Sequence, residues 1–126
     1  NLGDVSTRSK SFPAVRGGPN KDRGMAKLAL YVALEARVGK EEEAAEFLRP
    51  LLSLAQEEPG TTTWYAVRFD HNTFAIFDAF PDEDARDAHL AGQVAVTLIQ
   101  QAPDLFVDPP EIQRLDILAY KPHQEP

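Results

Sequence analysis

Two short segments rich in Thr, Val, Ile and aromatic residues lie only three residues apart, and this spacing constrains the fold more than any other feature of the chain. Residues 62–69 and 73–80 have the composition of strands, and Asp70-His71-Asn72 between them are turn-forming residues. A three-residue connection of this kind is typical of a β-hairpin. The two strands are therefore predicted to be antiparallel neighbours in one sheet.

The segments on either side of the hairpin complete a β-α-β-β-α-β order. Large apolar residues alternate with smaller or polar ones over residues 28–37 and again over 112–121, which predicts two further strands. Apolar residues follow helical spacing over 41–57, with a kink expected at Pro50, and over 81–103. This order predicts an α+β, ferredoxin-like fold, in which a four-stranded antiparallel sheet carries the helices on one face.

The other face of the predicted sheet needs a cover. Aromatic or apolar residues occupy both faces of several strands, as in the consecutive pairs Trp64-Tyr65 and Ile76-Phe77. A monomer would leave one of these faces exposed to water. We therefore expect a homodimer that packs sheet against sheet.

Residues 1–24 differ in composition from the rest of the chain. Their five basic and two acidic residues give a net charge of +3 in a chain of net charge −7, which leaves −10 for residues 25–126. Four of the seven glycines also lie there, and the apolar residues are few and without period. We expect an irregular arm, or an extension from cloning or from an over-long gene prediction with Met25 as the natural start. Residues 25–126 are expected to form a single domain.

Composition excludes several classes of function. A net charge of −7 argues against binding to nucleic acid, and no apolar run is long enough to span a membrane. The chain has no Cys, which fits a reducing, cytoplasmic location and rules out thiolate metal sites. The three histidines lack metal-ligand spacing, and no nucleotide-binding glycine pattern is present, so neither a metal nor an organic cofactor is expected. A small-molecule substrate is the expected partner.

His89 is the first candidate for chemistry. It shares a helix face with Ala85, Ala88 and Gly92, where a bend is expected, and this face is predicted to turn toward the sheet. A buried histidine could act as a general base, or it could be a core residue satisfied by one hydrogen bond. Because its face carries only small apolar residues, we predict that burial lowers the pKa of His89, unless Asp78 lies close enough to raise it.

Asp78 lies in an apolar strand and could orient an imidazole. The alternative is an ion pair within the fold, with one of three arginines as its partner: Arg68, Arg86 or Arg114. Arg68 has the alternation parity of Trp64, so it could also reach the rim of a pocket and stabilise an oxyanion there, or it could be a solvated charge.

Four aromatic residues offer flat walls for an aromatic substrate, although aromatic side chains in a small sheet also serve as plain core. They are Trp64, Tyr31, Phe77 and Phe80.

These segments resemble the antibiotic biosynthesis monooxygenase domain family. The resemblance rests on Glu58-Pro59-Gly60 before the second strand, on Asp78 two residues before Phe80, and on His89 in the following helix. It implies a dimeric α+β barrel with a pocket between helices and sheet in each subunit. It also implies oxygen insertion into an aromatic, quinol- or anthrone-like molecule without metal or flavin.

The resemblance further implies a role for each candidate residue. His89 would be the base and Asp78 its orienter, with Arg68 and Tyr31 as the oxyanion partners. Trp64 and Phe80 would clamp the aromatic substrate. Two alternatives stay open: a haem-binding or haem-degrading protein with His89 as axial ligand, and a non-catalytic small-molecule-binding or stress-associated dimeric barrel.

Overall fold

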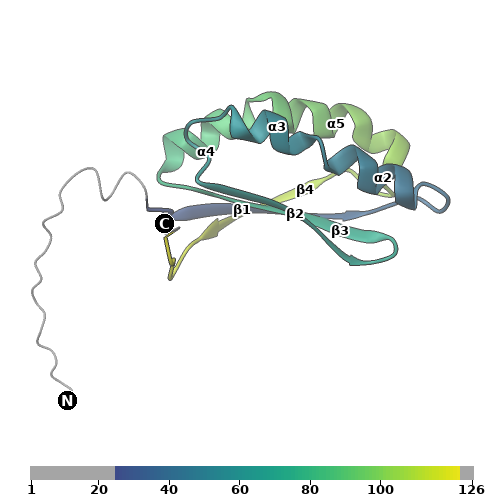
Figure 1. Cartoon of the computed structure of the whole chain (residues 1–126), viewed down its shortest axis with the longest axis horizontal. Helices are drawn as coiled ribbons and strands as arrows, with labels where there is room; N and C mark the ends of the chain where they lie inside the picture. Colours follow the sequence, from purple (N-terminus) through teal and green to yellow (C-terminus); the bar gives the residue numbers. More distant parts are fainter. Residues whose placement is uncertain (1–24, 123–126) are drawn as a thin grey trace, which may run out of the picture.

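The structure is a computed structural model that describes residues 25–122 of the chain (Figure 1). The arm expected over residues 1–24 and the tail residue His123 lie outside these residues. Figure 1 shows two layers, with all the labelled helices on one face of a twisted sheet and none on the other. Among the described residues, no helix has both the length and the apolar character needed to cross a membrane.

The sheet has four antiparallel strands in the order β2-β3-β1-β4, as predicted. The strands are β1 (Leu28–Glu35), β2 (Thr63–Asp70), β3 (Thr73–Phe80) and β4 (Glu111–Asp116). The predicted hairpin is β2-β3, in which Trp64 lies opposite Asp78. The fourth strand ends five residues earlier than the sequence pattern predicts, because the regular pairing of β4 with β1 ends at Asp116.

Each predicted helix is divided in two at the residue where a kink or bend was expected. Pro50 separates α2 (Glu41–Leu48) from α3 (Leu51–Gln56), and Gly92 follows α4 (Glu83–Leu90) and caps α5 (Gln93–Leu105). Because the helix is interrupted at Gly92, the residues of α5 that face the core differ from those expected for one continuous helix. Val96 and Ile99, which continue the helical spacing from His89 and Gly92 and would face inward in an unbroken helix, are exposed. The buried face of α5 consists instead of Val94, Ala95, Leu98, Ala102 and Leu105.

The two faces of the sheet differ in what covers them. Val32, Phe74 and Ile76 point toward the helices and belong to the main core. Tyr31 pairs directly with Phe77, and strand alternation places both on the opposite, open face. The expectation that Tyr31 and Phe77 line a pocket with His89 is therefore wrong, because that pocket would have to lie on the helical side.

Candidate active site around His89

Both ring nitrogens of His89 lie within hydrogen-bond distance of a carboxylate. Nδ1 is 2.6 Å from Oε1 of Glu58, and Nε2 is 3.1 Å from Oδ2 of Asp78. The side chains of His89 and Asp78 are only 6% and 2% exposed, while that of Glu58 is 19% exposed. The three residues form a carboxylate–imidazole–carboxylate chain that runs from the surface into the protein.

Strand alternation and helix capping bring His89 and Asp78 together. Asp78 shares the helical side of β3 with Ile76 and Phe80. The next helix, α4, begins directly after this strand, where the side chain of Asp82 accepts a hydrogen bond from Ala85 N at 2.9 Å. His89 lies in the last turn of that helix and packs at 5.2 Å from the Phe80 ring. Asp78, Phe80 and His89 are thus brought together, as the family resemblance implies.

Glu58 is a site residue that the sequence reasoning did not assign, although it belongs to the Glu58-Pro59-Gly60 motif. A Cβ on Gly60 would lie 2.7 Å from Cβ of Ala85, so only glycine lets this loop approach α4 so closely. A Cβ on Gly92 would lie 3.0 Å from Oε2 of Glu58. Thr61 Oγ1 also donates a hydrogen bond to Glu58 Oε1 at 2.7 Å. The motif therefore positions the Glu58 carboxylate against His89.

The carboxylates control the titration of His89. Burial lowers the pKa of His89, but the hydrogen bonds and charges of Asp78 and Glu58 outweigh it, so that the pKa is raised overall. The prediction of a lowered pKa is therefore wrong: β3 and the loop before β2 supply charges that the helix face of His89 does not show. Burial raises the pKa of Asp78, and the His89 hydrogen bond opposes this shift.

Two carboxylate oxygens at the site, Asp78 Oδ1 and Glu58 Oε2, are buried and have no hydrogen-bond partner within residues 25–122. Asp78 and His89 line an apolar cavity of about 20 Å³ between the sheet and α5. That volume holds one water molecule and no aromatic ring. His89 and Glu58 also border a surface groove of about 310 Å³. The imidazole thus separates an outer groove from an inner cavity.

Arg68 and Trp64 lie on the helical side of β2, as their shared parity predicts, but away from His89. Arg68 bonds to the hairpin and to α2, with Nη2 at 2.7 Å from His71 O and 2.9 Å from Glu42 Oε2. The hydrogen bond from Arg68 to Glu42 lowers the pKa of Glu42. Arg68 and Trp64 both line a separate hollow that does not include His89. A role for Arg68 as the oxyanion partner of a substrate at His89 is therefore not supported.

Arg86 and Arg114, the other arginines considered as partners of Asp78, bond to other groups. Arg86 is buried on α4, where its Nη1 donates to the carbonyl oxygens of Ala29 and Leu115 at 3.4 and 3.3 Å. Arg114 lies 3.7 Å from Asp87 at the surface. The charged partner of Asp78 is His89.

The fold is similar to that of a solved structure described as an antibiotic biosynthesis monooxygenase. A crystal structure from Nitrosomonas europaea described as a "putative antibiotic biosynthesis monooxygenase" has a TM-score of 0.66 at 18% identity and covers 73% of this chain and 99% of that one. Rv0793 from Mycobacterium tuberculosis also has a TM-score of 0.66, at 16% identity, with coverages of 75% and 98%. These similarities confirm the predicted fold.

A closer similarity identifies a family. The crystal structure of NE2512, a protein of unknown function from Nitrosomonas europaea, is 47% identical, with a TM-score of 0.77, and covers 81% of this chain and 99% of that one. This chain belongs to the same family as NE2512. No protein-family model and no curated protein matches the sequence.

Proposed function

We propose that the protein is a cofactor-independent monooxygenase that acts on an aromatic, quinol- or anthrone-like small molecule. The observation that carries this proposal is the buried Asp78 carboxylate, which has an unpartnered oxygen in an apolar cavity and is joined through His89 to Glu58. A buried carboxylate with a raised pKa is suited to proton transfer near neutral pH. The fold shared with the monooxygenase-like structure supports the same class of reaction.

The geometry favours Asp78 over His89 as the base. Both His89 nitrogens face carboxylates, whereas Asp78 Oδ1 has no partner among the described residues. Asp78 Oδ1 would take a proton from the acidic carbon or hydroxyl of the substrate. His89 holds Asp78 in place and offers a path for the proton to Glu58 and the outer groove.

The remaining steps need only dioxygen as a second reactant. The substrate anion gives one electron to dioxygen, and the two radicals combine to form a C–O bond. For a methylene substrate, loss of the second C–H proton and cleavage of the O–O bond leave a carbonyl group and one water molecule. One oxygen atom thus enters the product and the other leaves as water, so no external reductant is consumed.

Substrate entry requires a movement of the structure, because the cavity holds no more than a water molecule. Ile99 on α5 and Ile112 on β4 line the cavity, and Ile99 is 55% exposed. We therefore take the boundary between α5 and β4 as the route from solvent to Asp78. A shift of α5 away from the sheet edge would admit a ring.

Oxygen consumption with a panel of quinols and anthrones tests the proposal. Asp78→Asn keeps the size of the side chain and removes the base, so we expect kcat to fall by roughly 10²–10⁴. Asp87→Asn, at an exposed position on α4, is the control with the same chemical change and should leave kcat unchanged. Full turnover by a folded Asp78→Asn variant would contradict the assignment.

The same panel, together with haem, distinguishes the monooxygenase from the two alternatives. A non-catalytic binding protein would bind members of the panel without consuming oxygen. Axial ligation of haem by His89 would require one of its carboxylate hydrogen bonds to break, since both ring nitrogens are engaged. A Soret band that appears on addition of haem and is lost in His89→Ala would favour the haem protein over the monooxygenase.

A further inference from the structure

An apolar hollow between the helices and the edge strand β2 lies apart from His89. It has a volume of about 510 Å³ and is bounded by α2, α3, β2 and β3. Its apolar walls include Leu48, Leu52, Trp64 and Phe74. We call this space the Trp64 hollow. It shares no lining residue with the cavity at Asp78 and His89.

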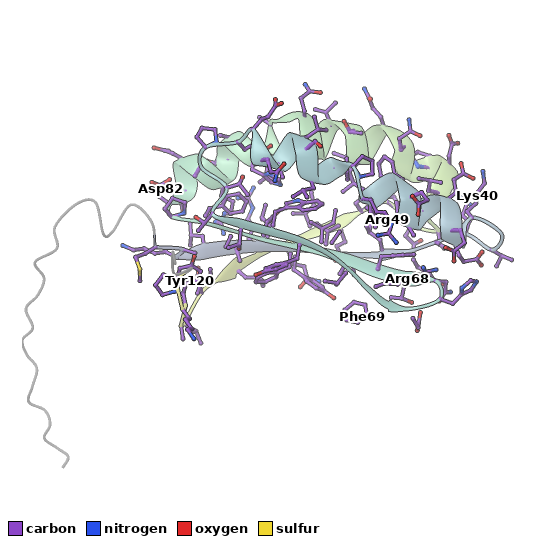
Figure 2. The ribbon with its side chains drawn as sticks, viewed as in Figure 1. Lys40, Arg49, Arg68, Phe69, Asp82 and Tyr120 are labelled. Carbon is purple, nitrogen blue, oxygen red and sulfur yellow. The ribbon has the colours of Figure 1, made fainter. Side chains whose placement is uncertain are left out.

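The charged side chains that line the Trp64 hollow are both basic, whereas the chain as a whole is acidic. Arg49 and Arg68 line the hollow and no carboxylate does, although the chain has a net charge of −7. Figure 2 shows Arg49 on the helical layer and Arg68 on the hairpin below it. A cationic rim on an acidic protein favours an anionic ligand over a neutral one.

The two guanidinium groups keep donors for a ligand. Arg49 uses Nε for an exposed pair with Glu46 at 3.1 Å, and its side chain is 71% exposed. The hydrogen bonds of Arg68 are made by Nε and Nη2, to the hairpin and to Glu42. Both acidic partners are about as exposed as Arg49, and exposed pairs of this kind are weak enough for a ligand to displace.

Trp64 supplies a third feature that points to a ligand. Its Nε1 is buried and has no hydrogen-bond acceptor among residues 25–122. A buried N–H without an acceptor is unfavourable, and a ligand oxygen in the hollow would reach this N–H only if the indole turned toward it. The indole also offers a face against which a flat molecule can stack, whereas the Phe74 ring is buried and has the Arg68 guanidinium over it at 4.9 Å.

We infer that the Trp64 hollow binds a flat aromatic carboxylate. The aromatic rings of this ligand stack on Trp64, and its carboxylate lies toward Arg49 and Arg68. This inference does not depend on the reaction proposed for Asp78, because binding in the hollow needs no turnover. It adds a second small-molecule site to the subunit.

Trp64 is the one tryptophan of the chain, so its fluorescence reports on the hollow directly. The probe is 2-naphthoate, and 2-naphthylmethanol is the neutral control of similar shape. We expect saturable quenching by 2-naphthoate, confirmed by calorimetry, and affinity for the alcohol about tenfold lower, as loss of one charge-assisted contact predicts. Absence of saturable binding, or equal affinity for the two probes, would overturn the inference.

Arginine variants locate the bound probe. Arg49→Gln and Arg68→Gln should each weaken 2-naphthoate binding by about tenfold, and Arg114→Gln on β4 should have no effect. Arg49 is exposed, so its variant is expected to fold even if Arg68→Gln does not. Binding that is unchanged in a folded Arg49→Gln variant would place the probe elsewhere and refute the site.

Discussion

The Nδ1 atom of His89 lies 2.6 Å from Oε1 of Glu58, although the two residues are 31 positions apart in the chain. This contact ties the loop before β2 to the last turn of α4. It depends on glycine at two points, because Gly60 meets Ala85 and Gly92 meets the Glu58 carboxylate. The electrostatics of the candidate site therefore rest on the backbone packing of a loop against a helix.

Gly60→Ala tests this dependence. The added methyl group would lie 2.7 Å from Cβ of Ala85, so the loop must move away from α4. We expect the free energy of unfolding to fall by roughly 1–3 kcal/mol, as for other overpacked positions. Urea unfolding measures this loss. The pKa of His89 should also fall, since Glu58 would move with the loop.

The double variant Gly60→Ala/Ala85→Gly separates overpacking from a general effect of replacing glycine. Removing the Ala85 methyl group makes room for the new one, so part of the lost stability should return. A helical glycine itself costs about 1 kcal/mol, which sets the limit of the recovery. If the double variant were less stable than the sum of the two single effects, overpacking against Ala85 would not be the cause.

Stability should decrease as the pH rises above neutrality. The folded-state pKa of His89 is raised, so its contribution is fully present below the unfolded value of about 6.5 and is lost as the pH rises through the folded value. The pKa of Asp78 is also raised, and a raised carboxyl pKa makes stability fall with increasing pH. The two effects have the same sign.

Urea unfolding between pH 5.5 and pH 9 measures this dependence. His89→Gln should flatten the part of the profile above about pH 6.5, where a free histidine loses its proton. His71→Gln is the control, because His71 is 69% exposed at the hairpin turn. A stability that is constant or rises over this range would show that burial, rather than the two carboxylates, controls His89.

Single substitutions of Asp78 and Glu58 should show which of the two carboxylates raises the pKa of His89 more. The Asp78 hydrogen bond raises the pKa of His89 more than the Glu58 hydrogen bond does. We therefore expect Asp78→Asn to lower this pKa more than Glu58→Gln does, as measured by NMR titration of the ring protons. A larger effect from Glu58→Gln would mean that the outer carboxylate is the stronger partner.

The sequence predicted the order of strands and helices along the chain and the hairpin, because these depend on local patterns and on short connections. The meeting of Asp78, Phe80 and His89 was implied by the family resemblance and not by the residue pattern. One wrong expectation could have been avoided from the sequence alone, because consecutive strand residues point to opposite faces, so Phe77 and Asp78 could not line the same pocket. The contact with Glu58 could not be predicted, because it depends on how closely a loop packs against a helix from a different part of the chain.

The open face of the sheet leads to the last prediction, which concerns assembly. Tyr65, Val67 and Phe69 alternate along β2 on this face and are 56%, 42% and 62% exposed. Figure 2 shows Phe69 on the side of the sheet away from the helices. An apolar strip of this kind on an uncovered sheet face is typical of a subunit interface, so we expect a homodimer.

Light scattering at micromolar concentration measures the assembly. The parent protein should give twice the chain mass of 14.0 kDa, and Val67→Lys/Phe69→Lys should give the mass of one chain, because two lysines on the strip would have to be buried facing a second copy. Val38→Lys is the control, since Val38 is an exposed apolar residue, 95% accessible, in the loop before α2. A parent protein of 14.0 kDa, or a double variant that remains dimeric, would show that the open face serves some purpose other than pairing two copies of this chain.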